Sequence, residues 1–361
     1  MATTSGYRRP IVGVIVGNKL VKTAGMKELA KANKKARLTL NFFSTKDVYF
    51  KRKKVRAIVF NINKKRWERR SLPIPDVLYV RGGSSLKVRL TVNRFDKMGI
   101  PRINPLVRFN KGELFRKLKR DKNIRPYLPY TKTIKRFSKI RKYVRSLGSI
   151  YIKACYGRKG TKVMRAVKKE GGYAYSYSVI HRTVRKKVKH FKDLKKVMKA
   201  FFGGREVIVQ KAIDLIRVGH NQPVDFRAEL QRNGRGKLKI IGISIRVGQK
   251  NSPITTHASA YKIDDQLKKL FPDYSDNQMD QLKKNIDDFL ITAYKSVEKI
   301  YGKFGELGID FAVDREGKIW LIECNAQSAK VSIGKAYGSR TVRKIYLNPL
   351  RYAKKIAKRR K

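Results

Sequence analysis

Cysteine, histidine and acidic residues are scarce in this 361-residue chain, and each scarcity narrows what the protein can be. The two cysteines, Cys155 and Cys324, make no disulfide framework, so a reducing cytoplasm is the expected location. The four histidines show no metal-ligand spacing, and a zinc site is therefore not expected. No apolar run approaches the roughly 20 residues that a membrane-spanning helix needs, so no membrane insertion is expected.

Positive charge is the largest excess in the composition. The chain has 89 Lys and Arg against 26 Asp and Glu, which gives a formal net charge of +63. Hydrophobic residues at 41%, with 18 Tyr and 16 Phe, still predict a folded core. The cations are spread along the whole chain, which fits either a solvated surface in an unusual ionic environment or adhesion to an acidic or polyanionic partner.

Three oxygen-bearing side chains stand out near the C-terminus, in the segment LGIDFAVDREGKIWLIECNAQ. Two alternating runs flank a tight turn and predict a β-hairpin in which Val313 pairs with Lys318. That register places Asp310 opposite Leu321 and on the same sheet face as Glu323 and Asn325. Carboxylate and amide oxygens at this spacing suit Mg²⁺ or Mn²⁺. An edge strand with a solvated polar face is the alternative interpretation.

Two lysines are candidates for contacts with phosphate groups. Lys153 ends the apolar strand SIYIK and precedes Gly157 and Gly160, whose backbone would let N–H groups approach phosphates. Lys111 begins a helix for which Asn110 and, three residues later, Glu113 predict a capping box. The spacing is not that of a P-loop, and either lysine alone is typical of a solvated surface. Gly82-Gly83-Ser84 is interpreted as a turn.

The order of elements predicts an α/β (α+β) protein with mixed and antiparallel sheets. We expect an amino-terminal α/β lobe over 1–104 and a main domain over 105–345. Within that domain, a small lobe covers about 125–210 and a second lobe about 211–345. Residues 346–361 are expected to form a basic C-terminal tail.

The ordered motifs carry a family resemblance. They are PDVLYVR, NKGELFRKLKRDKNIRPYLPYT, GSIYIKACYGRKG, VIVQKAIDL, PVDFRAELQ, ISIRVG and LGIDFAVDREGKIWLIECNAQ, over roughly residues 75–330. Together they resemble the ATP-grasp superfamily, and more narrowly its spore-coat-associated YheC/YheD type. This resemblance implies an ATP-grasp fold with a pre-ATP-grasp amino-terminal lobe. It also implies use of ATP and Mg²⁺ (or Mn²⁺), and a cytoplasmic or spore-coat-associated protein.

The resemblance also implies roles for the lysines and the loop. Lys111 and Lys153 would contact ATP phosphates, and the loop containing Gly157 and Gly160 would close over them. The adenine would be read by the backbone of the hinge, with one further contact to the ribose. The implied hinge residues are Gln210, Lys211 and Ile213, and the ribose contact is Asp214.

Asp310, Glu323 and Asn325 would hold the metal, again as the resemblance implies. Arg227 and Arg246 would stabilise an acyl phosphate and the developing oxyanion, so the implied reaction joins a carboxylate substrate to an amine or thiol acceptor.

The chain departs from the family pattern in four places, including Ala154 after the strand lysine and Ser328 at the end of the metal motif. These departures and the charge motivate an alternative function: a non-catalytic protein that binds nucleic acid, polyphosphate or a spore matrix on a relic ATP-grasp fold.

Overall fold

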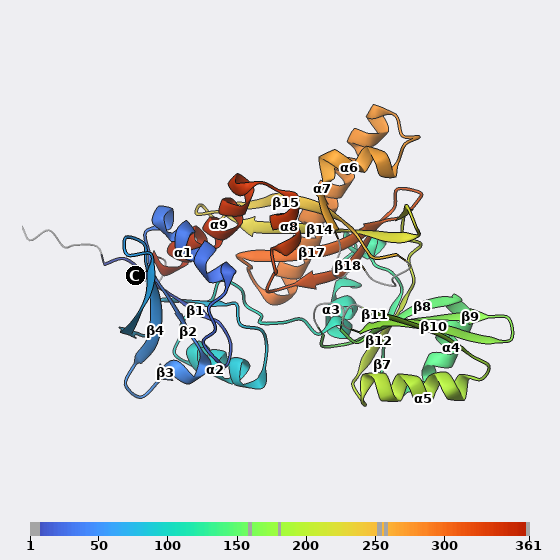
Figure 1. Ribbon diagram of the computed structural model, residues 1–361, viewed down its shortest axis with the longest axis horizontal. Helices are drawn as coiled ribbons and strands as arrows, with labels where there is room; N and C mark the ends of the chain where they lie inside the picture. The colour runs from blue at the N-terminus through green and yellow to red at the C-terminus, as the bar shows by residue number, and fades with distance from the viewer. Residues whose placement is uncertain (1–7, 158–160, 180–181, 251–254, 256–258, 359–361) are drawn as a thin grey trace, which may run out of the picture.

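Each of three β-sheets supports one lobe of the molecule (Figure 1). The computed structural model describes residues 8–157, 161–179, 182–250, 255 and 259–358. Gly160, predicted to belong to the phosphate loop, lies outside the described residues, as does part of segment 256–261, another of the four places where the chain departs from the family pattern. No helix in the described part of the chain has both the length and the apolar character needed to cross a bilayer.

The N-terminal lobe is a six-stranded sheet in the order β3-β4-β2-β1-β6, with β5 paired to β4. Strand β1 runs parallel to both β2 and β6, so the carboxyl ends of β1 and β6 meet at one edge. At this edge Gly82 packs directly against Gly17. The elements are β1 (Ile11–Ile15), α1 (Ala24–Ala36), β2 (Thr39–Phe43), η1 (Thr45–Asp47), β3 (Val48–Tyr49), β4 (Lys54–Asn61), β5 (Arg66–Pro73), β6 (Val77–Val80) and α2 (Leu86–Lys97).

The middle lobe is a six-stranded antiparallel sheet in the order β11-β10-β9-β8-β12-β7. Along β8, Ile150 and Ile152 share a buried cluster with two helices, so Tyr151 and Lys153 face the other side of the sheet. The elements, with the linker helix α3 that precedes them, are α3 (Lys111–Leu118), η2 (Arg125–Tyr127), β7 (Thr131–Ile134), η3 (Phe137–Lys139), α4 (Ile140–Leu147), β8 (Ser149–Ala154), β9 (Val163–Lys169), β10 (Gly172–Val179), β11 (Arg182–Val188), α5 (Phe191–Phe202) and β12 (Val207–Lys211).

The C-terminal lobe is built on strands in the order β16-β15-β14-β17-β18, with β13 paired to β14. Its elements are β13 (Arg217–Val218), β14 (Gln222–Arg232), β15 (Leu238–Val247), β16 (Ser259–Lys262), α6 (Ile263–Leu270), α7 (Asp276–Tyr301), β17 (Glu306–Val313), β18 (Ile319–Asn325) and α8 (Val331–Ala336).

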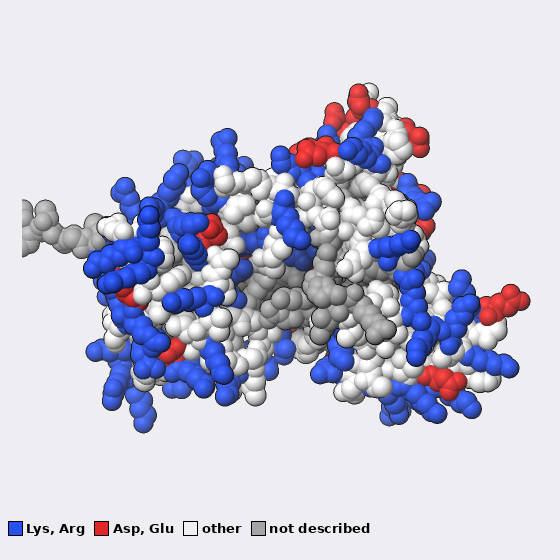
Figure 2. All heavy atoms as spheres, viewed as in Figure 1, with Lys and Arg blue, Asp and Glu red and all other residues white. Residues whose placement is uncertain are grey.

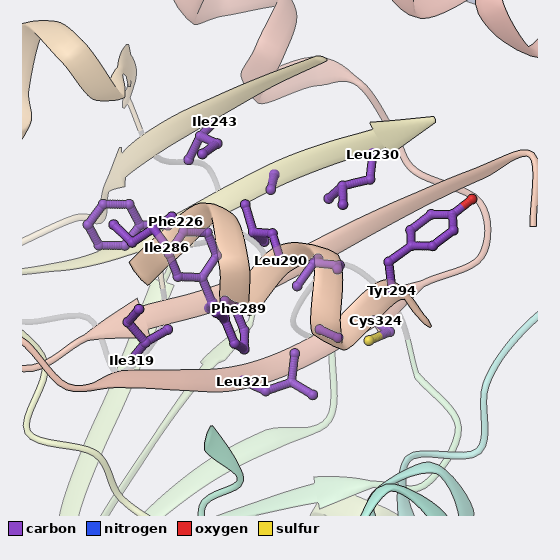
Figure 3. Packing of buried hydrophobic residues seen from close by; sticks show 14 of the residues in the cluster. Phe226, Leu230, Ile243, Ile286, Phe289, Leu290, Tyr294, Ile319, Leu321 and Cys324 are labelled. Atoms are coloured by element: carbon purple, nitrogen blue, oxygen red, sulfur yellow. The ribbon is translucent and has the colours of Figure 1, made fainter. Parts of the chain in front are cut away.

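Helix α7 covers one face of this sheet. Ser275 and Gln278 form a capping box at its start. The apolar residues at helical spacing, such as Ile286 and Phe289, pack on Phe226 of β14 and its neighbours, as Figure 3 shows. Because α7 takes this face, polar side chains of β14, β17 and β18 point to the opposite face.

The C-terminal segment is a helix, α9 (Ser339–Lys358), which packs against α1 of the N-terminal lobe. Residues 346–358, expected to belong to a basic tail, therefore continue a helix whose apolar side is buried. Leu350, Ala353 and Ala357 share a core with Met26 and Leu29. These three apolar residues recur at helical spacing, but lysines and arginines lie between them. The apolar side of the helix was therefore not recognised in the sequence.

A buried ionic network joins the N-terminal and C-terminal lobes. Glu306 of β17 accepts hydrogen bonds from the Tyr79 hydroxyl and from Arg81, each at 2.8 Å. Lys330 pairs with Glu306 and, at 2.8 Å, with Glu229, and all three of these side chains are at most 1% exposed. The charges balance, with two cations for two carboxylates, so burial of the network leaves no net charge uncompensated.

Candidate functional site

The hairpin β17–β18 carries the predicted metal ligands, but its register differs from the predicted one. Val313 pairs with Ile319 rather than Lys318, and a β-bulge at the Asp310/Phe311 step brings Asp310 directly opposite Glu323. The predicted pairing of Asp310 with Leu321 is therefore wrong. The bulge adds a residue to one strand, and this brings the two carboxylates closer than the diagonal arrangement would.

Asp310 and Glu323 belong to a row of side chains that crosses the sheet. Arg227 of β14 is the register partner of Asp310, which in turn pairs with Glu323. Arg227 donates through two nitrogens to the Asp310 carboxylate, the second bond at 2.8 Å. The Asn325 amide lies 3.4 Å from the same carboxylate. Burial alone would raise the pKa of Asp310, but Arg227 and Arg246 more than offset it and lower the pKa, so Asp310 is an anion.

Arg246 of β15 is held by a carboxylate to which no role was assigned from the sequence. Asp225 accepts two hydrogen bonds from Arg246, each at 2.6 Å, and a third from the Thr255 hydroxyl. Arg246 also lies 3.4 Å from Asp310. Burial would lower the pKa of Arg246, but the neighbouring carboxylates raise it, so this guanidinium stays charged.

Lys111 is the first residue of α3, and its side chain is buried, with only 9% exposed. Its amino group lies 3.2 Å from Glu323 and 3.4 Å from the carbonyl oxygen of Gly157. Asn110 caps the helix as predicted, by accepting from the Glu113 N–H. Glu113 pairs with Lys117 at 2.7 Å, and the structure shows only the Asn110 half of the predicted capping box.

Lys153 lies on the face of the middle sheet away from its helices and donates to the Gln210 side chain at 2.7 Å. Gln210 donates in turn to the Thr131 hydroxyl at 3.0 Å. Burial lowers the pKa of Lys153 to about 8, with Glu323 and Lys111 among the charges that act on it. The charges of the two lysines and of Glu323, on the strand with predicted metal ligands, therefore act on one another.

The loop after β8 is described up to Gly157. A side chain at Gly157 would place its Cβ 3.3 Å from the Thr161 carbonyl oxygen, so the chain is closely packed where Lys111 reaches it. Cys155 is 1% exposed, and burial followed by the charge of Glu206 raises its pKa to about 12. The Cys155 thiol is therefore protonated near neutral pH, which argues against a role as a nucleophile. Cys324 lies among the apolar residues beneath α7 (Figure 3).

The hinge after β12 differs from the rest of the site in its exposure. Lys211 pairs its backbone N–H with the Tyr130 carbonyl oxygen at 2.9 Å, and its side chain points to solvent. Ile213 is half-buried. The Asp214 side chain is 83% exposed, with Arg315 at 4.0 Å. Gln210, by contrast, is buried and has its side chain occupied by Lys153 and Thr131.

The site as a whole is cationic. Four cations, Lys111, Lys153, Arg227 and Arg246, surround three carboxylates, Asp225, Asp310 and Glu323. Such a balance favours a polyanionic ligand such as a triphosphate.

A hard divalent ion fits the donors present. Among the described residues no three His, Cys, Asp or Glu side chains cluster as a metal site. Asp310 and Glu323 stand opposite each other. The Asn325 side chain lies alongside with its nitrogen donating to Asp310, and its amide oxygen is the third candidate donor. Mg²⁺ is commonly held by one or two carboxylates, with water and substrate phosphates completing its shell.

Three residues of the site were not predicted from the sequence: Asp225, Thr255 and Thr131. Asp225 lies two residues before Arg227 on β14, so both side chains point to the same face of the sheet. This spacing could have identified Asp225 as a residue of the site. Thr255 lies 30 residues from its partner Asp225. Thr131 lies 79 residues from Gln210. No local pattern marks either hydroxyl.

The three sheets form the fold of an ATP-grasp protein. The profile of the YheC/D like ATP-grasp family matches residues 99–356. The chain belongs to this family.

Two relatives from Bacillus subtilis (strain 168) are similar in sequence. Endospore coat-associated protein YheD is 27% identical over 273 residues, which cover 73% of this chain and 59% of YheD. Endospore coat-associated protein YheC is 22% identical over 303 residues, 78% of each chain. The alignment thus spans less than two thirds of the length of YheD.

Solved structures show the same fold at low sequence identity. D-cycloserine synthetase DcsG has a TM-score of 0.56 at 12% identity, over 97% of this chain and 100% of its own. D-alanyl-alanine synthetase A from Vibrio cholerae has a TM-score of 0.55 at 14% identity, over 96% and 99%. The ATP-grasp ligase PsnB, solved with a precursor variant, Mg and ADP, has a TM-score of 0.54 at 13% identity, over 93% and 96%.

Proposed function

We propose that this protein is an ATP- and Mg²⁺-dependent ligase that joins a carboxylate substrate to an amine acceptor. The observation that carries the proposal is the single constellation in which Lys111, Lys153, Arg227 and Arg246 surround Asp310 and Glu323. Membership of the ATP-grasp family supports ATP as the nucleotide. The names of the ligase neighbours support the reaction class.

In the proposed reaction the substrate carboxylate oxygen attacks the γ-phosphorus of ATP, and ADP leaves. The amine nitrogen then attacks the acyl carbon, phosphate leaves and the amine loses a proton. Asp310, Glu323 and Asn325 would hold Mg²⁺, which supplies charge neutralisation on the phosphate oxygens when bound.

The side chains of the protein itself position the substrates and neutralise their negative charge. Lys111 and Lys153 bind phosphate oxygens from the linker helix and from the middle sheet. Arg227 and Arg246 stabilise the negative charge that develops on the transferred phosphoryl group and the acyl oxygen. Asp225 holds Arg246 in orientation through its two hydrogen bonds. Positioning and electrostatics carry this chemistry, and it needs no protein nucleophile.

The hinge makes a smaller contribution in this proposal. The backbone near Gln210, Lys211 and Ile213 reads the adenine edge, and Asp214 contacts the ribose from its exposed position. Association with the spore coat belongs to the proposal as well, since both relatives are named for it.

The experiment is calorimetric titration of Mg·ATP into the full chain at high salt, followed by a screen for ADP release with carboxylate and amine pairs. Magnesium-dependent binding that Glu323→Gln weakens by at least about tenfold supports the site. ADP release that needs both an acid and an amine supports the reaction. Failure of the parent chain to bind Mg·ATP would refute the proposal.

A further inference from the structure

The outward side of α4, with the η3 turn before it, is a cationic surface that the nucleotide site does not use. It forms an open groove with a volume of about 700 Å³. The groove is lined by Ser138, Lys139, Arg141, Lys142, Arg145 and Ser146. Four of these six residues are cations, and none of them is acidic.

Helix α5 extends this cationic surface. Leu194 and Met198 of α5 share a buried cluster with Tyr143 and Val144 of α4, so both helices cover the same face of the middle sheet. Four lysines lie along α5, at 192, 195, 196 and 199, and Asp193 is its one acidic residue. We call the outward sides of η3, α4 and α5 the α4–α5 face. Lys and Arg side chains crowd the surface of this lobe in Figure 2.

The cations of the α4–α5 face have no carboxylate partners within the described residues. None of the four on η3 and α4 or the four on α5 takes part in a salt bridge there. On the β4–β5 hairpin, by contrast, Arg66 and Arg70 lie near Glu68, and Arg56 lies near Asp47.

This lack of partners has an energetic consequence. Like charges three and four residues apart on a helix repel one another, as Arg141 and Arg145 do here. A bound polyanion would relieve this repulsion.

The α4–α5 face lies behind the nucleotide site. Ile150 and Ile152 of β8 point toward the helices, and Lys153 points to the other side of the same sheet. A partner on this face would therefore leave the Lys153 side of the sheet open to ATP.

The types of side chain on the α4–α5 face indicate which kind of partner it binds. Neither α4 nor α5 has a large exposed apolar or aromatic side chain, so the face offers no pocket for a peptide anchor and no platform for base stacking. Neither helix contains Asn or Gln, the side chains that pair with adenine edges. It offers charge in closely spaced rows and the hydroxyls of Ser138 and Ser146, which suit repeated phosphates.

We propose that the α4–α5 face binds the phosphate backbone of double-stranded DNA without reading its sequence. This role is separate from the proposed ligase activity and needs no ATP. Each phosphate that these cations neutralise would release a condensed counterion, so the affinity should fall steeply as the salt concentration rises.

The test is fluorescence anisotropy with a labelled DNA duplex of mixed sequence, about 20 base pairs long, and the full chain across a series of salt concentrations. The variant is Arg141→Gln/Lys142→Gln/Arg145→Gln. We expect its affinity at physiological salt to fall at least about tenfold, and the slope of log affinity against log salt to become shallower by about 2 to 3.

A matched variant removes the same charge elsewhere. Arg56→Gln/Arg66→Gln/Arg70→Gln neutralises three arginines on the β4–β5 hairpin and should change the affinity by less than about threefold. If this control loses as much affinity as the α4 variant, DNA adheres through net charge alone and the proposal is overturned.

Two further outcomes would overturn it. Competition by single-stranded DNA, or by polyglutamate at equal charge concentration, that matches unlabelled duplex would show that the face does not select duplex phosphates. Should the α4 variant fail to fold by circular dichroism, Lys192→Gln/Lys195→Gln/Lys196→Gln on α5 tests the same face. Unchanged affinity of that folded variant would reject it.

Discussion

The Lys111 amino group lies 3.2 Å from the Glu323 carboxylate and 3.4 Å from the Gly157 carbonyl oxygen. One buried cation on the linker helix thus contacts both β18 of the C-terminal lobe, which carries two of the predicted metal ligands, and the loop of the middle lobe. A triphosphate bound between these two lobes would lie next to the Lys111 amino group. Lys111 therefore links the strand that is proposed to hold the metal to the loop that is proposed to close over the phosphates.

Glu323→Gln should weaken magnesium-dependent ATP binding. The amide keeps the shape of the side chain but removes the negative charge that attracts Mg²⁺, so we expect Kd for Mg·ATP to rise by at least about tenfold. Calorimetric titration with and without Mg²⁺ measures this. Glu316→Gln, on the exposed turn of the same hairpin, is the matched control and should bind as the parent does. Equal binding by Glu323→Gln would remove Glu323 from the metal site.

Lys153 should make ATP binding sensitive to alkaline pH. Burial lowers its pKa to about 8, so the free protein loses this positive charge as pH rises through that value. Phosphate binding requires the protonated form, and the affinity should therefore fall by up to about tenfold for each pH unit above 8. Titrations at pH 7 and pH 9 measure the change.

Lys153→Arg supplies the control for this pH dependence. A guanidinium stays charged throughout the range, so the variant should show a flat profile between pH 7 and 9. A parent profile that is equally flat would mean that Lys153 does not contact the phosphates.

The alternation of polar residues on β17 and β18 predicted which sheet face would carry Asp310, Glu323 and Asn325, and the structure brings these three together. The register differs from the prediction in two places. The turn pairs Val313 with Ile319 instead of Lys318, and the bulge then leaves Ile322 unpaired. An apolar residue beside Leu321 gives no sign of such an insertion.

Contacts distant in sequence could not be predicted from local pattern. Arg81 and Glu306 are 225 residues apart, and Lys330 and Glu229 are 101 apart. Periodicity reports the face on which a residue lies within its own element, and it carries no information on which element packs against that face. The lysines of the candidate site were accessible to the sequence reading because each lies beside a local signal, a helix cap for Lys111 and a glycine-containing loop for Lys153.

Lys330→Met should destabilise the protein strongly. It would leave the carboxylates of Glu229 and Glu306, both fully buried, without their shared cation. Removing one partner of a buried ion pair typically costs about 3–5 kcal/mol of the free energy of unfolding. Urea denaturation measures this. The control Lys344→Met, at an exposed position on α9, should stay within about 0.5 kcal/mol of the parent. A loss below about 1 kcal/mol for Lys330→Met would show that the network does not hold the lobes together.

Gly82→Ala should damage the N-terminal lobe where β1 and β6 end. An added Cβ would lie 1.9 Å from the Gly17 nitrogen and 2.1 Å from the Val16 carbonyl carbon, so backbone would have to move. The adjacent Gly83 exchanges hydrogen bonds with Gln327, at 3.0 and 2.9 Å, and that movement would disturb the junction with the C-terminal lobe. We expect a loss of at least about 1–3 kcal/mol in the free energy of unfolding, measured by urea denaturation.

Gly334→Ala, on the exposed side of α8, is the comparison for this substitution. A Cβ there meets nothing within 4 Å, and alanine is the better helix former, so this variant should be neutral or up to about 1 kcal/mol more stable. The contrast isolates steric overlap from the general effect of replacing glycine. If both variants unfold at the same urea concentration as the parent, the close approach of Gly82 to Gly17 is not required, and the turn assigned to residues 82–84 has room for a side chain.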